Sequence, residues 1–298
     1  MASPDLLTAV RESLPFSDQV TGVEPVPVSE RVTRLLLSLA DGTQFPCVVK
    51  TASTRELLLY EQILTPEETG APQFIGGYRW QDEETCYLFL ECLPEQFLDP
   101  ESSTDVVSAY RFLGELHRYW AARPQPDLPA GSPWEITPAD IESALESFPR
   151  LASHAAEVAE AFGKGPRTLI HGDYYRWNVL VDDELVRVLD WEHATFSHPL
   201  WDVVLLTPDR SHRESQLGGA MAELALRVYH GHGPFADMPF PEFDKLHRMA
   251  RIALSARRAL AHKARMAESP HGPAEVIRVH LRHEQELMEA MGKRLQWW

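Results

Sequence analysis

The first third of the chain alternates apolar and polar residues with the periodicity of half-buried β-strands. An Asp41-Gly42 pair separates two of these runs and is a strong signal for a hairpin turn. Helices are predicted before and within the pattern, at residues 3–14 and 54–64. The strand-like runs are residues 20–28, 32–39, 45–50, 74–80 and 85–91. We therefore predict a small antiparallel sheet with few helices in residues 1–92.

From residue 93 onward, the apolar positions recur at helical spacing instead. The strongest helix covers residues 103–121, and Thr137-Pro138 caps and begins another after a proline-rich loop. Residues 168–192 are predicted to form two short strands flanking a loop. Further helices are expected at residues 151–162, 213–230, 241–267 and 273–295. The pattern predicts an α+β fold with two lobes, a β-rich lobe of residues 1–92 and a mainly helical lobe of residues 93–298.

The composition, with 44% apolar and 24% charged residues, is that of an ordinary globular protein. No run approaches the ~20 apolar residues that span a bilayer, so we expect no membrane association. The first residues lack the basic and apolar regions of a signal peptide, which favours the cytoplasm. The three cysteines have no metal-type spacing, so we expect reduced thiols with neither a disulfide nor zinc.

The formal net charge of −16 argues against general affinity for nucleic acid and favours a cationic substrate. On charge alone, it is more typical of an acidic cytosolic protein with no such substrate. Arginine supplies most of the positive charge, and Lys50 is the only lysine in the first 163 residues. A single lysine at the end of an apolar strand therefore suggests a specific role. The oligomeric state cannot be derived from these features.

Candidate chemistry is concentrated between residues 171 and 192. Asn178 is the only asparagine of the chain, and it ends the run His171-Gly172-Asp173-Tyr174-Tyr175-Arg176-Trp177-Asn178. Leu189-Asp190-Trp191-Glu192 follows shortly afterwards. Asp173 is placed to accept a proton from an attacking hydroxyl, whereas Asn178 and Asp190 offer the oxygen ligands that Mg²⁺ prefers.

The phosphates of a nucleotide need a cation, and Lys50 is the candidate. Either Glu56 or Glu61, on the following helix, could orient that lysine. Taken singly, each residue has an ordinary structural explanation. Lys50 alone is more typical of a strand-edge charge, and Glu56 of a first-turn acid that complements the helix dipole. Their common order along the chain, together with Asp173, Asn178 and Asp190, favours a shared site.

The run His-Gly-Asp-x4-Asn, followed by Leu-Asp-Trp-Glu, resembles the aminoglycoside phosphotransferase and choline kinase group, which has a protein-kinase-like fold. The resemblance extends over about residues 20–206. It includes the segments Phe45-Pro46-Cys47-Val48-Val49-Lys50, Arg55-Glu56-Leu57-Leu58-Leu59-Tyr60, Tyr87-Leu88-Phe89-Leu90-Glu91-Cys92-Leu93-Pro94, Phe112-Leu113-Gly114-Glu115-Leu116-His117 and Ser197-His198-Pro199-Leu200-Trp201-Asp202.

The resemblance implies a kinase that uses ATP or GTP with Mg²⁺ and phosphorylates a hydroxyl of a small acceptor. It implies Asp173 as the catalytic base, and Asn178 and Asp190 as metal ligands. The implied nucleotide-binding residues are Lys50, Glu56 and the hinge residues Glu91 and Leu93. His171 and Asp202 would support the loop by hydrogen bonds. Glu192 is a further candidate for the metal or a ligating water. Arg176 would either stabilise the transferring charge or stack on an aromatic ring.

One departure from this group concerns the segment Pro25-Val26-Pro27-Val28-Ser29-Glu30-Arg31, where a phosphate-covering turn is expected but no glycine occurs. This feature favours the alternative of a catalytically silent nucleotide-binding protein, although every key polar residue is present. A protein kinase is less consistent with the sequence, because little chain lies between Asp190 and Pro199 to form an activation segment. A metal hydrolase is disfavoured because there is no His-Glu-x-x-His helix. The leading acceptor is an amine-bearing molecule such as an aminoglycoside or an amino alcohol.

Overall fold

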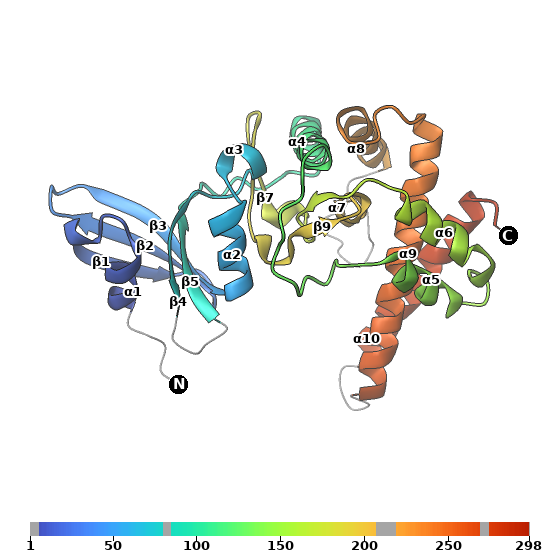
Figure 1. The fold of residues 1–298 in the computed structure, drawn as a ribbon, viewed down its shortest axis with the longest axis horizontal. Coiled ribbons are helices and arrows are strands. Elements are labelled where there is room, and N and C mark those ends of the chain that lie inside the picture. The colour runs from blue at the N-terminus through green and yellow to red at the C-terminus, as the bar shows by residue number, and fades with distance from the viewer. Residues whose placement is uncertain (1–5, 80–84, 207–218, 269–273, 298) are drawn as a thin grey trace.

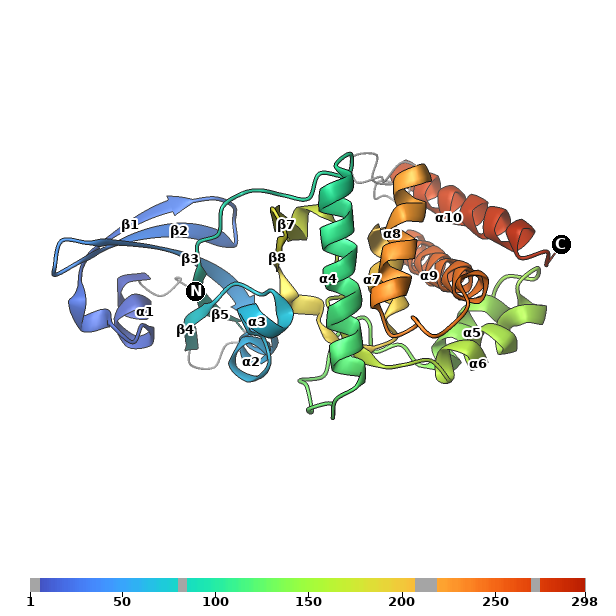
Figure 2. The same cartoon turned by 90° about the horizontal axis from the view of Figure 1, so that it is seen from above.

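A computed structural model of the chain describes residues 6–79, 85–206, 219–268 and 274–297. The molecule is elongated, with a β-rich part at one end and long C-terminal helices at the other (Figure 1). Helix α4 lies between these ends (Figure 2). The architecture is α+β, which confirms the fold class expected from the sequence. The lobe boundary between residues 92 and 93 stays a prediction.

The N-terminal sheet is antiparallel throughout, with the strand order β1-β2-β3-β5-β4. Alternation along β3 directs Cys47 and Val49 into a core that includes helix α1, while Lys50 lines a cavity on the other face. The register places Lys50 between Val32 of β2 and Leu88 of β5. The bounds are α1 Leu6–Ser13, β1 Val20–Pro27, β2 Val32–Leu39, β3 Gln44–Ser53, β4 Phe74–Arg79 and β5 Thr85–Glu91.

Helix α2, Thr54–Gln62, begins directly after β3 because Ser53 caps it. The hydroxyl of Ser53 accepts the backbone N–H of Glu56 at 3.2 Å, which satisfies one of the unpaired amides of the first turn. Leu57 and Leu59 of this helix are fully buried in the main core. The cap therefore fixes the position of Glu56, one turn beyond the strand that carries Lys50.

The C-terminal part is built from helices, of which α4 has the bounds that the sequence predicts. Ser102 caps α4, and Thr137 and Asp140 form a capping box at the start of α5. Helix α4 packs against α8, and α9 packs against α10. The bounds are α3 Pro66–Thr69, α4 Ser103–Ala121, α5 Pro138–Glu146, α6 Ala155–Gly163, α7 Leu200–Leu206, α8 Gly219–His232, α9 Phe240–Glu268 and α10 Ala274–Arg294.

Short strands and single turns occupy the segment between α6 and α7. The sequence predicts two strands in residues 168–192, whereas the structure has three there and a fourth just beyond. Strands of three or four residues are too short to show a clear periodicity, so the prediction gave too few strands in this segment. Strand β6 pairs with β9, and β7 pairs with β8. The bounds are β6 Thr168–Ile170, η3 Arg176–Asn178, β7 Val179–Asp182, β8 Leu185–Val188, η4 Trp191–His193 and β9 Thr195–Ser197.

Other predicted elements differ mainly at their ends. The start of the first predicted helix and residues 213–218 of a later one lie outside the described residues. The helix predicted at residues 151–162 begins as a 3-10 turn, η2 Ala152–His154, and another such turn, η1 Ser17–Gln19, precedes β1. Among the helices that the structure describes, none is both long enough and apolar enough to cross a membrane.

Candidate active site

Asp202, in the first turn of α7, anchors the loop that follows β6. Its two carboxylate oxygens accept the backbone N–H groups of His171 and Gly172, each at 2.7 Å. His117 Nε2 lies 3.2 Å from the same carboxylate, and Asp202 and His117 are fully buried. Gly172 has a φ of +82°, and a Cβ there would come within 2.5 Å of the Trp134 ring. The loop is thus fixed by a buried carboxylate and by a position that favours glycine.

His171 joins the two chain segments that carry the candidate acids. Its Nδ1 accepts the N–H of Asp173 at 3.1 Å, so the proton lies on Nε2, which donates to the carbonyl oxygen of Leu189 at 2.7 Å. Burial lowers the pKa of His171, which favours this neutral form. The residue after Leu189 is Asp190. A neutral imidazole therefore sets the spacing between Asp173 and Asp190.

Asn178, at the end of the 3-10 turn η3, contacts Asp173. Its Nδ2 donates to the backbone oxygen of Asp173 at 3.0 Å and to the Asp173 carboxylate at 3.1 Å. These bonds use the amide nitrogen, which leaves the amide oxygen as the atom that can bind a cation. Burial raises the pKa of Asp173, and the nearby charge of Asp190 adds to that effect. Asp173 is therefore a stronger proton acceptor than an exposed aspartate.

Lys50 lies between two carboxylates. Its Nζ is 2.7 Å from Glu56 Oε1 and 2.5 Å from Asp190 Oδ1, and Glu56 is fully buried. Burial opposes the charge on Lys50, but Glu56 and Asp190 outweigh it, so the pKa of Lys50 is raised. Burial likewise opposes the charge on Asp190, but Lys50 outweighs it and the pKa of Asp190 is lowered. Glu61, the other candidate partner, instead pairs with Arg79 at 2.6 Å.

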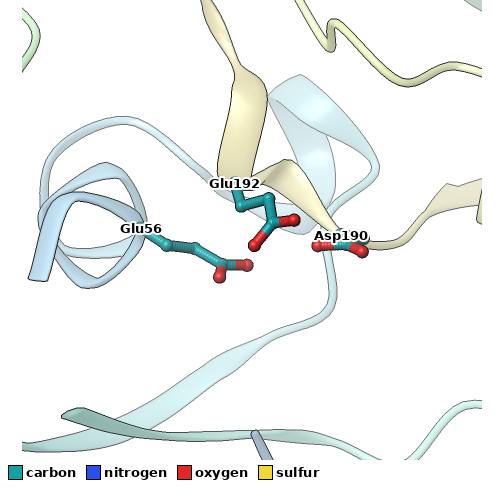
Figure 3. Close-up of side chains that lie close together, drawn as sticks. All are labelled: Glu56, Asp190 and Glu192. Atoms are coloured by element: carbon teal, nitrogen blue, oxygen red, sulfur yellow. The ribbon is translucent and has the colours of Figure 1, made fainter. Parts of the chain in front are cut away.

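A third carboxylate, that of Glu192, completes an acidic cluster. Figure 3 shows Glu56, Asp190 and Glu192 with their carboxylates gathered in one place, and one oxygen of each lies within 4.8 Å of the others. Arg31 Nη2 donates to Glu192 Oε2 at 2.7 Å. Arg55, in α2, donates to the backbone oxygen of Glu192 at 2.6 Å and thereby ties the helix to this segment. Two arginines thus reach from the N-terminal part to the turn after Asp190.

The donor set suits a hard divalent cation. The amide oxygen of Asn178 and the carboxylates of Asp190 and Glu192 are all oxygen ligands, as Mg²⁺ prefers. The carboxylates of Glu56, Asp190 and Glu192 gather three negative charges in one place, where a cation would be attracted. Asp190 also has a left-handed backbone, with φ of 62°, a conformation that non-glycine residues adopt rarely and often at functional sites.

A cavity of about 280 Å³ lies next to this cluster. One polar end carries Lys50, Asn178 and Asp190, whereas the remaining lining is mostly apolar residues from both parts of the chain, with Arg34 and Glu95 among them. The hinge residues Glu91 and Leu93 line it too. The apolar wall contains Val32, Tyr60, Leu90, Phe97, Leu180 and Leu189. Such a combination of an apolar slot and a charged end suits a ligand with a flat base and anionic groups.

Two of the predicted residues have other contacts. The Glu91 carboxylate accepts the Gln73 N–H at 3.2 Å and lies 3.5 Å from Arg187, so its side chain is engaged within the protein. The Arg176 guanidinium lies 4.0 Å from the centre of the Trp177 ring, which agrees with the stacking alternative.

Sequence reasoning assigned no role to Arg31 or Arg55. Both contact the segment around Glu192, across more than 130 positions of the chain. No sequence signal distinguishes them, because arginine is the common cation of this chain.

Comparison with known proteins identifies the class of this site. A model of a phosphotransferase enzyme family matches residues 61–243, which is more than half of the chain. The chain therefore belongs to that family. The matched region contains Asp173, Asn178, Asp190 and Asp202 but begins after Lys50 and Glu56. No curated protein sequence matches the chain.

Solved structures share the fold over almost the whole chain. A choline/ethanolamine kinase family protein from Mesorhizobium loti is 16% identical, with a TM-score of 0.60 over 94% of this chain and 91% of that one. An aminoglycoside phosphotransferase from Alicyclobacillus acidocaldarius is 14% identical, with a TM-score of 0.58 over 100% and 98% of the two chains.

A thermostable aminoglycoside phosphotransferase mutant, in a ternary complex with AMP-PNP and hygromycin B, is 14% identical with a TM-score of 0.54 over 96% and 98%. At these identities the similarity concerns the fold. The family match identifies the chain as a phosphotransferase, as the sequence predicts.

Proposed function

We propose that this protein transfers the γ-phosphate of ATP or GTP to a hydroxyl group of a small, amine-bearing molecule, with Mg²⁺ as cofactor. One observation carries the proposal: Lys50, Asn178 and Asp190 form one charged end of a cavity whose remaining lining is mostly apolar. A nucleotide is complementary to both the apolar and the charged part of such a cavity. Its base would lie against the apolar wall and the backbone of Glu91 and Leu93, and its phosphates would extend toward Lys50.

Lys50 is prepared for this role by its two ion pairs. Glu56 is buried and fixed by the cap of α2, so it holds the ammonium near the place where the phosphates would bind. Asn178, Asp190 and Glu192 would hold Mg²⁺, which when bound neutralises phosphate charge. Positioning and charge neutralisation supply most of the catalysis in phosphoryl transfer.

Asp173 is the proposed general base. Its carboxylate would accept the proton of the acceptor hydroxyl as the oxygen attacks the γ-phosphorus. The bond from that phosphorus to the β-phosphate oxygen breaks, and the nucleoside diphosphate leaves with the electron pair. The raised pKa of Asp173 increases its proton affinity, while the bond from Asn178 keeps the carboxylate in a defined orientation. His171 and Asp202 would act as positioning residues, since they hold the loop rather than the reactants.

The acceptor class follows from charge. A chain with a net charge of −16 attracts cationic molecules, and choline and aminoglycosides both combine an amine or ammonium group with hydroxyls. Choline/ethanolamine kinase and aminoglycoside phosphotransferase structures are among the proteins with this fold, which supports acceptors of this kind. We place the activity in the cytoplasm, where ATP and reduced thiols are both expected.

The test is nucleoside diphosphate release with Mg²⁺, measured against a panel of aminoglycosides, amino alcohols, sugars and nucleosides. Acceptor-dependent release that Asp173→Ala abolishes, while nucleotide binding persists, would support the proposal and name the substrate class. Full turnover by Asp173→Ala would refute the role of Asp173. Nucleotide binding without release for any acceptor would favour a silent binding protein instead.

A further inference from the structure

The turn between β1 and β2, residues 28–32, covers the polar end of the site but contains no glycine. Four of the five backbone amides of residues 28–32 are already used within the turn. The N–H groups of Val28 and Ser29 donate to the carbonyl oxygen of Val32, at 2.9 and 3.0 Å. Those of Arg31 and Val32 donate to the Ser29 hydroxyl, at 3.3 and 3.2 Å. A phosphate therefore cannot take these four amides without breaking the turn, in contrast to a glycine-rich loop whose amides cradle the phosphates.

The side chain of Arg31 offers donors at the same place. Its Nε donates to the backbone oxygen of Thr51 at 3.2 Å, and the Arg31 carbonyl accepts the N–H of Thr51 at 2.7 Å. These two bonds hold Arg31 beside the residue that follows Lys50. The guanidinium also contacts Glu192, whose carboxylate lies within 4.8 Å of Asp190 in the acidic cluster. Arg31 is therefore a second cation at the edge of the proposed phosphate site.

Lys50 and Arg31 differ in how tightly they are held. The Lys50 side chain is 10% exposed and is shared between two carboxylates. The Arg31 side chain is 50% exposed and has one carboxylate partner, Glu192. An ion pair with one well-exposed partner contributes little to stability, so exchanging the partner of Arg31 costs little free energy. A guanidinium also binds phosphate through two parallel hydrogen bonds, which an ammonium cannot do.

We propose that Arg31 is the phosphate-binding group of the glycine-free turn, and that a bound nucleotide replaces Glu192 as its partner. The inference rests on the proposed function, since it requires a nucleotide in the cavity. On binding, the Arg31 guanidinium turns from the Glu192 carboxylate to the phosphate oxygens. The exchange leaves Glu192 free to act as a ligand of Mg²⁺. Without nucleotide, Glu192 thus holds Arg31 beside the phosphate site. Without metal, Glu192 competes with phosphate for the Arg31 guanidinium.

Direct binding measurements test this exchange. Dissociation constants for ATP and adenosine, and in parallel for GTP and guanosine, are compared for the wild type, Arg31→Gln and Arg79→Gln. Arg79 is the matched control, because it is equally exposed, lies in the same sheet and pairs with Glu61. Arg31→Gln should weaken triphosphate binding by about tenfold or more and change nucleoside binding by less than about twofold. Arg79→Gln should change neither.

Glu192 gives a second and independent readout. Without Mg²⁺, Glu192→Gln should strengthen triphosphate binding by about threefold or more, because Arg31 no longer has a competing partner. In the Arg31→Gln background the same change should have no effect. A gain that persists in that background would show general charge repulsion and would overturn the exchange.

The outcomes separate this inference from the proposed function. A wild type that prefers the triphosphate to the nucleoside, together with an Arg31→Gln variant that keeps the same preference, would overturn the inference and leave the kinase proposal intact. Equal losses for triphosphate and nucleoside in Arg31→Gln would assign Arg31 a merely structural role. A wild type that binds triphosphate no better than nucleoside would overturn both proposals.

Discussion

Replacing Asp202 by asparagine should destabilise the fold, even though the two side chains have nearly the same shape. The Asp202 carboxylate accepts the N–H groups of His171 and Gly172 at 2.7 Å each and lies 3.2 Å from His117 Nε2. An amide in its place has one acceptor oxygen and one donor nitrogen. Whichever way the amide is turned, its NH₂ group faces the backbone N–H of either His171 or Gly172, and two donors cannot form a hydrogen bond.

The size of the effect follows from these contacts. A hydrogen bond to a charged group contributes about 1.5–3 kcal/mol, and an unsatisfied buried donor costs about 1–3 kcal/mol. Asp202→Asn loses at least one such bond and leaves one buried N–H unpaired. We therefore expect the free energy of unfolding to fall by about 3 kcal/mol, and kcat to fall as the loop with Asp173 loosens.

Urea denaturation followed by circular dichroism measures the first quantity, and Asp173→Asn is the matched control. The chemical change is the same in both variants, but the pKa of Asp173 is raised, because burial and the charge of Asp190 both disfavour its ionised form. Its neutral isostere should unfold within about 1 kcal/mol of the wild type while losing turnover. Equal stabilities for the wild type and Asp202→Asn would refute the support assigned to Asp202, as would an equal loss in both variants.

Acid should destabilise the protein below neutrality, because burial lowers the pKa of His198 and of His247 to about 3. The unfolded chain takes up protons near pH 6.5 and the folded chain does not, so this contribution is complete above pH 6.5 and is lost as the pH falls toward 3. From pH 7.5 to 5, each histidine should remove about 2 kcal/mol from the free energy of unfolding, and a urea midpoint that is flat over this range would contradict the reasoning. In activity assays, Glu56→Gln should lower kcat/KM by about tenfold or more because Lys50 loses a buried partner, whereas Glu61→Gln, at an exposed pair, should stay within about twofold. Equal losses in these two variants would show that the pairing does not matter for turnover.

Several elements could be predicted from the sequence because local signals agree there. Helix α4 has a serine cap and a regular apolar face, and its predicted bounds match the structure. The strand that carries Lys50 and the helix that carries Glu56 were both predicted, since alternation and helical spacing are strong in these runs. The strands around the candidate loop were missed in part, because their order depends on pairing with distant segments rather than on their own few residues.

The candidate residues themselves were recognisable by type and order, but not by contact. Asp173, Asn178 and Asp190 are the oxygen-bearing side chains that a metal and a phosphate acceptor require, and their order along the chain is a sequence property. The choice between Glu56 and Glu61 as the partner of Lys50 cannot be made from the sequence, because both lie on the same helix. It depends on the angle at which α2 packs on the sheet, which directs Glu56 toward Lys50 and Glu61 toward Arg79.

By itself, the sequence determined the α+β class, the order of the main strands and helices, and the candidates for binding metal and phosphate. Periodicity and capping depend on a few neighbouring positions, so they can be recognised in the sequence. The tertiary structure alone decided that Arg31 meets Glu192, that Asp202 binds the loop at Gly172 and that Lys50 is shared between Glu56 and Asp190. These contacts join residues far apart in the chain, and only the packing of the sheet against the helical part brings them within hydrogen-bond distance.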